Sequence, residues 1–357
     1  MDGGGQRSAA PAAQFEPGRI ARAARRGSGR ASLLVFFLCF AVYVAGNGLP
    51  ATPDSQLSPR ETRILLTTSS LVNDGDFELT NQYRDHGWQA FGGSPVKPSG
   101  LLINGRLIEP HGFLFPALLA PAYAVGGRTA VQLLLALIAA LGMVAAAALA
   151  RLIVPDPWAS GAAIAVGLSP PAVIAATTIR PAAACGAAIA FAALLALRAR
   201  AAPTPRRAIS AGALIALLPW LGAVTLLPAA VITFALYRWL RHRSRGWVGL
   251  VATELVLLSV VVYVSINARI FGGLTPLSGS AIADPPTGAA SVGAYIDRLP
   301  RLAELLFDPQ IGLLLTAPVL MSQWRSAVSW EDWRRLQTGR WRWLKRTMPR
   351  GWRPPPA

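Results

Sequence analysis

Long apolar stretches separated by short basic or turn-rich connectors dominate this chain. Segments such as 31–46, 129–150 and 247–266 approach the roughly 20 apolar residues that a helix needs to cross a bilayer. Only 14% of the residues are charged, whereas soluble domains carry about 25%. The pattern predicts an all-α polytopic membrane protein with about 8–9 transmembrane helices, and we place its transmembrane domain at residues 31–321.

Two polar stretches interrupt the apolar pattern and are expected to form the large loops of the domain. The first, residues 50–112, follows the first apolar segment and concentrates Asp and Glu residues; the second, residues 267–310, is rich in Gly and Pro turn signals. Between 208 and 240 the apolar run is too long for one crossing and contains Pro219 near its middle, which predicts a helical hairpin. Because acids gather on the first large loop, we expect the protein's chemistry there.

The first loop contains one strong local signal. Ser58 followed by Pro59 and, three residues on, by Glu61 forms a capping box with proline at the first helical position. Apolar residues then recur at helical spacing until Asn73, where Asp74 and Gly75 indicate a helix end. The sequence predicts an amphipathic helix over 59–73 that lies along the outer surface with its apolar face down.

The formal net charge of +17 invites a nucleic-acid interpretation, but its distribution favours topology. Arginines precede the first apolar segment and fill the connectors 198–207 and 238–245, and short Arg-rich loops mark the cytoplasmic side. Residues 1–30 are therefore predicted to be a disordered, basic, cytoplasmic N-terminus of a protein in the cytoplasmic membrane. The alternative is a cleaved secretory signal with 31–46 as its apolar core.

The predicted topology requires an odd number of crossings between the first loop and the connector 198–207. Four apolar segments lie between them, at 111–125, 129–150, 158–179 and 181–197. Either the short first segment does not cross, or the third is two short helices broken at Ser169-Pro170-Pro171, since proline removes a backbone donor and restricts its predecessor. We favour the break, which places Arg180 near the outer surface.

The C-terminal residues 322–357 differ abruptly in composition. They interleave Arg and Trp after an apolar run, 311–321, that is too short to span a membrane. Two interpretations remain: an interfacial amphipathic segment, or a frameshifted or truncated end of the apolar span.

Several loop residues carry candidate chemistry, each with a structural alternative. The structural alternative for Glu61 is closure of the capping box, and the alternative for Asp54, which follows Pro53, is a turn. Asp74, Asp76 and Glu78 have the oxygen ligands that a divalent cation prefers, although three acids beside a glycine more often form a solvated turn. His111 starts an apolar segment and is either an interfacial hydrogen-bonding residue or a contributor to a site.

The order of these segments resembles that of a known family. A helix, a large acidic outer loop and then the motif LIEPHGFLFPALLAP over 107–121 look like the polytopic glycosyltransferases of the C superfamily, which use lipid-phosphate sugar donors. The block RILLTTSSLVNDGDFELTNQY over 63–83 is similar to uncharacterised actinobacterial members of that group. The resemblance covers roughly residues 31–318.

The resemblance implies an acid of the first outer loop at the acceptor, often Asp followed by Glu. The matching pair here is Arg60-Glu61, with arginine at the aspartate position, so Asp54 and Glu61 are the candidate catalytic bases. The resemblance also implies a second acid, which commonly follows a later short helix as part of a Pro-Asp pair. At the corresponding place this chain has no acid but the residues Ile179-Arg180-Pro181. Both departures weigh against an active enzyme.

Sugar transfer from a polyprenyl phosphate needs a base for the acceptor hydroxyl and cations for the departing phosphate. Guanidinium groups match phosphate bidentately, so the candidate substrate-binding residues are Arg60, Arg63, His111 and Arg180. Arginines at the ends of spans also serve as interfacial anchors. The expected partners are a lipid-phosphate sugar donor and membrane lipids, with no nucleic acid and no cofactor.

Two other function classes compete with a glycosyltransferase. The first is a non-catalytic membrane protein, either a degenerate relative or a truncated gene product. The second is a transporter, which usually has charged residues within its spans; Glu254 is the clear candidate for such a residue.

Overall fold

The computed structural model describes residues 17–48, 57–92, 95–100, 102–103, 105–201, 204–241, 246–279, 293 and 296. The chain divides into two compact units, residues 1–290 and 291–357, and every helix and strand reported below belongs to the first. Asp54, most of the predicted second loop, the run 311–321 and the tail 322–357 lie outside the described residues.

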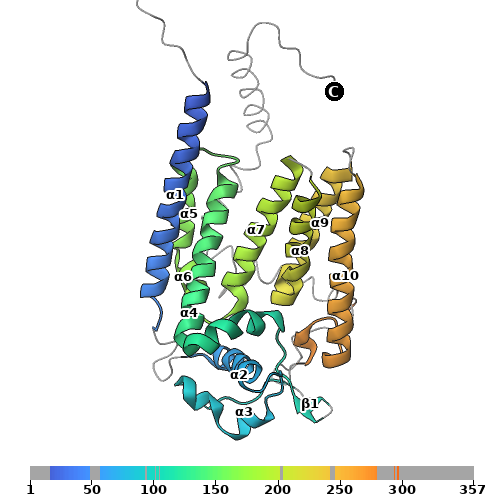
Figure 1. Ribbon diagram of the computed structural model, residues 1–357. Coiled ribbons are helices and arrows are strands. Elements are labelled where there is room, and N and C mark those ends of the chain that lie inside the picture. Colours follow the sequence, from blue (N-terminus) through green and yellow to red (C-terminus); the bar gives the residue numbers. More distant parts are fainter. Residues whose placement is uncertain are drawn as a thin grey trace, which may run out of the picture. The chain divides into compact units, whose positions relative to one another are not determined.

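The first unit is a bundle of long helices that stand side by side (Figure 1). Its elements are α1 (Pro17–Ala45), α4 (Leu114–Ala150), α5 (Trp158–Gly167), α6 (Pro170–Thr177), α7 (Pro181–Ala201), α8 (Pro205–Leu221), α9 (Leu226–Arg241) and α10 (Gly246–Phe271). Mutual packing of their apolar residues, many of them alanines on α7 and α8, forms the core of the bundle. The prediction of a mostly helical protein is confirmed, and several of its helices are long and apolar enough to cross a membrane.

The number of spans is smaller than predicted over the described residues. Four helices there are long and apolar enough to cross a membrane, or five if α5 and α6 form one bent span. The apolar part of α1, Gly29–Ala45, is shorter, and α8 has 17 residues. The predicted 8–9 spans are therefore not confirmed over the described residues: α1 and α8 are short, and some of the predicted apolar segments belong to two larger units.

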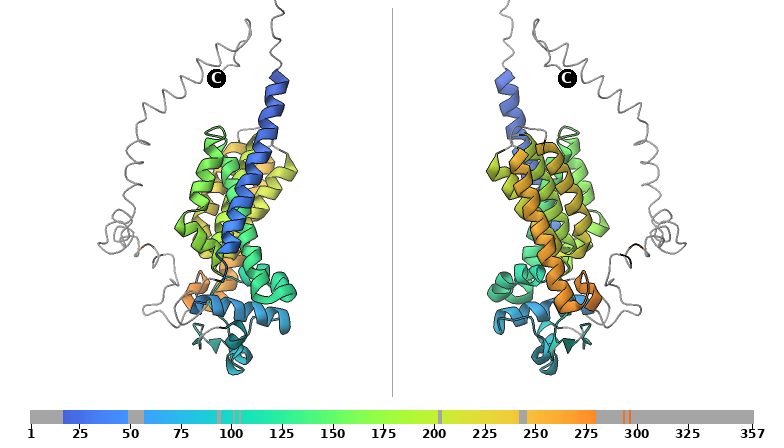
Figure 2. Two further views of the ribbon diagram at one scale, coloured as in Figure 1. Left: turned by 90° about the vertical axis from the view of Figure 1, so that its left-hand side faces the viewer. Right: turned by 90° about the vertical axis from the view of Figure 1, so that its right-hand side faces the viewer.

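The first of these larger units is α4, which joins the predicted segments 111–125 and 129–150 into one kinked helix. Gly126 and Gly127 leave helical geometry in its middle, and Gly127 has a φ of 56°. The part before the kink projects sideways at the end of the bundle, and the part after it runs with the other helices (Figure 2). Residues 114–125 therefore form no span of their own.

The second larger unit is the broken pair α5–α6. The break falls between Gly167 and Pro170, as predicted, and the two helices meet at a bend of 62°. The pair follows α1 along its length: Arg151 hydrogen-bonds both Ser32 and Ser160 near one end, and Gly46 lies against Thr177 at the other. If the pair forms one bent span, then α4, the pair and α7 supply the odd number of crossings that the predicted topology requires, and the short segment 111–125 is the one that does not cross.

Three element boundaries differ from or refine the predictions. α1 begins at Pro17, so residues 17–30, predicted to be disordered, are helical; alanine and arginine favour helix, and extending a helix needs no new nucleus. The predicted hairpin over 208–240 is confirmed as α8 and α9, joined at Gly222 and a short 3₁₀ helix, η2 (Ala223–Thr225). α10 continues to Phe271, so the first residues of the predicted second loop are helical.

One end of the bundle carries the polar loop, and we call it the loop end (Figure 1). The loop contains α2 (Pro59–Asn73), α3 (Thr80–Arg84), the 3₁₀ helix η1 (Gly87–Phe91) and a small antiparallel hairpin. The hairpin pairs β1 (Leu102–Ile103) with β2 (Arg106–Leu107). A short 3₁₀ helix, η3 (Pro276–Gly279), follows α10.

The predicted amphipathic helix is confirmed with its expected bounds and capping box. Its apolar residues, including Ile64 and Leu65, are buried against Phe115 and Leu119 of α4 and against Ile179. The apolar face of α2 is therefore covered by protein rather than turned down toward lipid. This packing fixes α2 across the end of the bundle and positions the side chains discussed next.

Candidate functional site

Glu61, one of the two predicted bases, is a buried structural residue. Its side chain is only 3% exposed. Oε2 accepts hydrogen bonds from the Ser58 backbone N–H at 2.9 Å and from the Ser58 hydroxyl at 2.6 Å. Oε1 accepts the backbone N–H of Ile179 at 2.8 Å. Both carboxylate oxygens are thus occupied in capping α2 and holding the chain segment before α7 against it.

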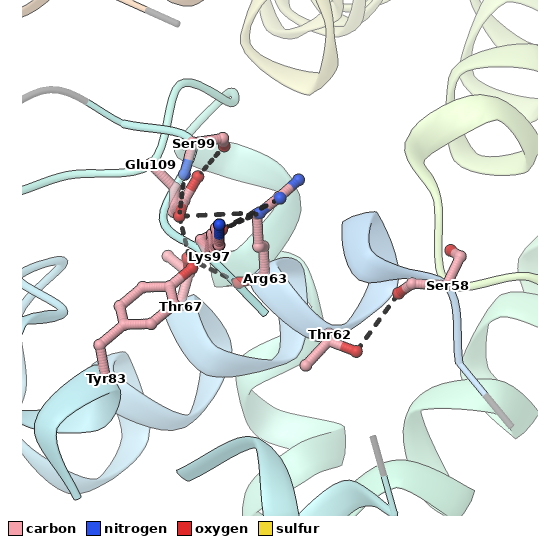
Figure 3. A network of polar contacts seen from close by, with 8 residues as sticks. All are labelled: Ser58, Thr62, Arg63, Thr67, Tyr83, Lys97, Ser99 and Glu109. Atoms are coloured by element: carbon pink, nitrogen blue, oxygen red, sulfur yellow. Dashed lines mark hydrogen bonds and ion pairs between the residues drawn. The ribbon is translucent and has the colours of Figure 1, made fainter. Parts of the chain in front are cut away.

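A second buried carboxylate, Glu109, lies in the same loop and was not singled out from the sequence. It is 2% exposed and accepts hydrogen bonds from the Tyr83 hydroxyl at 2.6 Å, the Ser99 backbone N–H at 3.1 Å and the Ser99 hydroxyl. Figure 3 shows these groups around it. The sequence feature that could have indicated Glu109 is its position between the apolar residues Ile108 and Pro110, because a buried ionisable group needs hydrogen-bond partners.

The pKa of Tyr83 is raised well above its usual value. Burial is the larger cause, and the neighbouring Glu109 carboxylate adds to it, because both disfavour the phenolate. Tyr83 therefore remains a hydrogen-bond donor across the working pH range. Glu109 joins α3, the segment 95–100 and the chain entering α4, so its role is to fix the shape of the loop.

Three predicted arginines gather at the start of α2. Arg63 donates from Nε and Nη2 to the Lys97 carbonyl at 3.2 and 3.1 Å, and its Nε lies 4.0 Å from Glu109 Oε1, long for an ion pair. Arg180 donates to the Ser58 hydroxyl at 3.3 Å, as expected from its predicted place near the loop. Arg60 is exposed. No ion pair joins Arg60 or Arg180 to an acid in the described part of the chain.

His111 lies within the field of two of these cations. Burial, and then the positive charges of Arg60 and Arg63, lower the pKa of His111 to about 4, because each disfavours the imidazolium. Its backbone N–H donates to the Glu109 carbonyl at 2.9 Å, so the Glu109 network also positions it. Nε2 is enclosed and makes no hydrogen bond with the described residues. His111 is therefore a neutral hydrogen-bonding group at physiological pH.

The residues after His111 hold the loop against the far side of the bundle. A Cβ on Gly112 would lie 2.6 Å from the Trp220 carbonyl oxygen at the end of α8, so only glycine fits this approach. Phe113 contacts Phe77 edge-on at 5.1 Å and stacks on Phe271 of α10 at 5.9 Å between centroids. These contacts place His111 where α2, α4, α8 and α10 meet.

The acids considered for a divalent cation serve the turn after α2. Asp76 Oδ1 accepts from the Ser70 hydroxyl and the Glu78 backbone N–H. Glu78 Oε1 accepts from the backbone N–H groups of Thr80 and Leu107, and Asp74 accepts from side-chain amides of α3. Across the described ranges no three His, Cys, Asp or Glu side chains are grouped to hold a metal ion.

The structure thus brings together five of the six predicted site residues: Arg60, Glu61, Arg63, His111 and Arg180. It assigns Glu61 a structural role, and Asp54 lies outside the described residues. The remaining set is cationic and hydrogen-bonding, which suits binding of an anion such as a phosphate. Comparison of the chain with protein-family models, with curated proteins and with solved structures gave no match.

Proposed function

We propose that the protein is a glycosyltransferase-like integral membrane protein that transfers a sugar from a polyprenyl-phosphate donor on the outer face of the cytoplasmic membrane. The observation that carries this proposal is the group of three arginines at the start of α2: Arg60 and Arg63 act on the neutral His111, and Arg180 contacts Ser58 next to them. The group lies at the end of a bundle whose helices are long enough to cross a membrane, and a lipid-linked phosphate lies at such an end.

In this proposal the arginines bind the donor phosphate and the imidazole donates or accepts a hydrogen bond beside it. The acceptor oxygen forms a bond to the anomeric carbon of the sugar while the bond from that carbon to the phosphate oxygen breaks. A base takes the proton of the acceptor hydroxyl, and the electron pair of the broken bond leaves with the polyprenyl phosphate, whose charge the guanidinium groups stabilise.

Asp54 is the proposed base. Glu61 is a poor candidate, because its two oxygens already accept three hydrogen bonds and its side chain is buried. The same observation favours the second candidate function, a non-catalytic donor-binding protein, if Asp54 is not the base.

The test is transfer of a radiolabelled sugar from polyprenyl-phosphate donors to cell-wall acceptors by the purified full chain, together with donor binding. Asp54→Asn should abolish transfer and leave binding intact, whereas Arg60→Gln should weaken binding about tenfold, as expected for loss of a charge-assisted contact. Arg106→Gln is the matched control, since Arg106 is an exposed arginine of the same loop. Binding without transfer by the wild type establishes the non-catalytic alternative; absence of donor binding refutes both.

A further inference from the structure

A groove of about 340 Å³ lies between the helices α4, α7 and α8. α7 packs against both α4 and α8, but α4 and α8 scarcely touch each other; α7 lies between the two in Figure 1. The floor is formed by α7, with small residues such as Ala184, Ala187 and Ala188 beside larger ones such as Phe191, and the walls are leucines and an isoleucine of α4 and α8. The small floor residues give the groove its depth.

The shape and chemistry of this groove fit a hydrocarbon chain. Its lining is apolar apart from one residue, Arg198. On α7 the lining extends from Ala184 to Arg198, which is about 21 Å at 1.5 Å per residue, or about two-thirds of a hydrocarbon core roughly 30 Å thick. A long apolar groove on helices of this hydropathy is suited to a single extended acyl chain.

One end of the groove carries an exposed positive charge, that of Arg198. Arg198 is in the last turn of α7, at the opposite end from Arg180, and is exposed. Its neighbour Arg200 lies over the Trp239 ring at 4.8 Å, but Arg198 forms no ion pair with any carboxylate among the described residues. Residues 181–241 contain no Asp or Glu at all. The positive charge at this end is thus unopposed by local acids.

We propose that one anionic phospholipid binds here, with an acyl chain in the groove and its phosphate on Arg198. The groove supplies apolar burial along the chain, and the guanidinium supplies a phosphate contact at the depth of the headgroups. This lipid site is at the opposite end of α7 from the arginines at the loop end. It therefore stands independently of the proposed donor site.

Native mass spectrometry of the full chain in neutral detergent tests the proposal, with phosphatidylglycerol, phosphatidylcholine and glycerol 1-phosphate added separately. One phosphatidylglycerol should bind about fivefold more tightly than phosphatidylcholine, the effect of one basic residue on one net negative charge. Glycerol 1-phosphate should not bind measurably, because it lacks the chain. Equal binding of the two lipids, or binding of glycerol 1-phosphate as tight as that of phosphatidylglycerol, overturns the proposal.

Two variants test the headgroup contact and the acyl-chain contact separately. Arg198→Gln should remove the preference for phosphatidylglycerol, whereas Arg206→Gln, which changes an exposed arginine outside the groove, should keep it. Ala188→Phe should fill the groove and weaken both lipids, whereas Ala182→Phe, on the exposed face of α7, should not. Retention of the preference in Arg198→Gln contradicts the site even if Ala188→Phe fails to fold.

Discussion

Glu61 and Ile179 are joined by a 2.8 Å hydrogen bond between a side-chain carboxylate oxygen and a backbone N–H, across 118 positions of sequence. The bond holds the start of α2 against the segment that leads into α7. The residue that caps α2 therefore also makes a tertiary contact. This contact brings Arg180 next to Ser58, close to Arg60 at the start of α2. The geometry of the candidate phosphate site therefore depends on this buried carboxylate.

Replacement of Glu61 should lower the free energy of unfolding, because the side chain caps α2 and holds Ile179. Glu61→Ala leaves the Ile179 N–H without its acceptor and removes the cap, at a cost of roughly 2–3 kcal/mol. Glu61→Gln keeps one carbonyl acceptor and should cost less. The midpoint of thermal unfolding in detergent measures both, and sugar transfer at low temperature separates the roles. A stable Glu61→Gln protein without any transfer activity would assign catalysis to Glu61 after all.

The His111 imidazole predicts a pH dependence of stability. Its pKa is about 4 in the folded protein and about 6.5 in the unfolded chain, so between these values the unfolded chain binds a proton that the folded one does not. Stability from this residue is complete above about pH 6.5 and is lost as pH falls toward 4, by at most about 3 kcal/mol.

Chemical unfolding of wild type and His111→Gln at pH 7 and pH 4.5 tests this dependence, and the variant should lose less stability than the wild type. Arg60→Gln should raise the pKa of His111, because it removes one of the two positive charges that lower it. NMR titration of the imidazole measures this change. An unchanged imidazole pKa in Arg60→Gln would show that Arg60 does not contribute to lowering it.

Gly112 is predicted not to tolerate a larger residue without a shift of the backbone around it. Gly112→Ala places a methyl group 2.6 Å from the Trp220 carbonyl oxygen, so the loop and α8 must separate, at a cost of about 1–3 kcal/mol. Gly186→Ala is the control: it lies within α7 with no atom near the added methyl and should be neutral or stabilising by up to about 1 kcal/mol. Equal thermal unfolding midpoints for the two variants would contradict the close approach.

The Tyr83 hydroxyl should stabilise the loop through Glu109. Tyr83→Phe removes a donor from a buried carboxylate and should cost about 1–3 kcal/mol. Tyr237→Phe is the matched control, because its hydroxyl makes no hydrogen bond with the described residues. Hydrogen exchange of the segment 95–100, which Glu109 holds through Ser99, should accelerate in Tyr83→Phe and not in the control. Unchanged exchange in both variants would show that the hydrogen bond from Tyr83 to Glu109 does not stabilise the segment 95–100.

The sequence by itself determined the elements whose causes are local. The capping box around Ser58 and Glu61 predicted α2 to its end residues, and Ser169-Pro170-Pro171 predicted the break between α5 and α6, because capping and proline sterics act within a few residues. Apolar length likewise predicted α10 and the α8–α9 hairpin.

Only the tertiary structure decided which polar groups meet and which apolar segments cross. Residues 114–125 pack on α2 instead of forming a span, since their apolar faces find protein there. Glu109 acquired its role only from Tyr83 and Ser99, each ten or more residues away. The low pKa of His111 likewise depends on burial and on arginines of α2, about fifty positions earlier in the chain. These properties arise from burial and from long-range contacts, which composition and spacing along the chain do not specify.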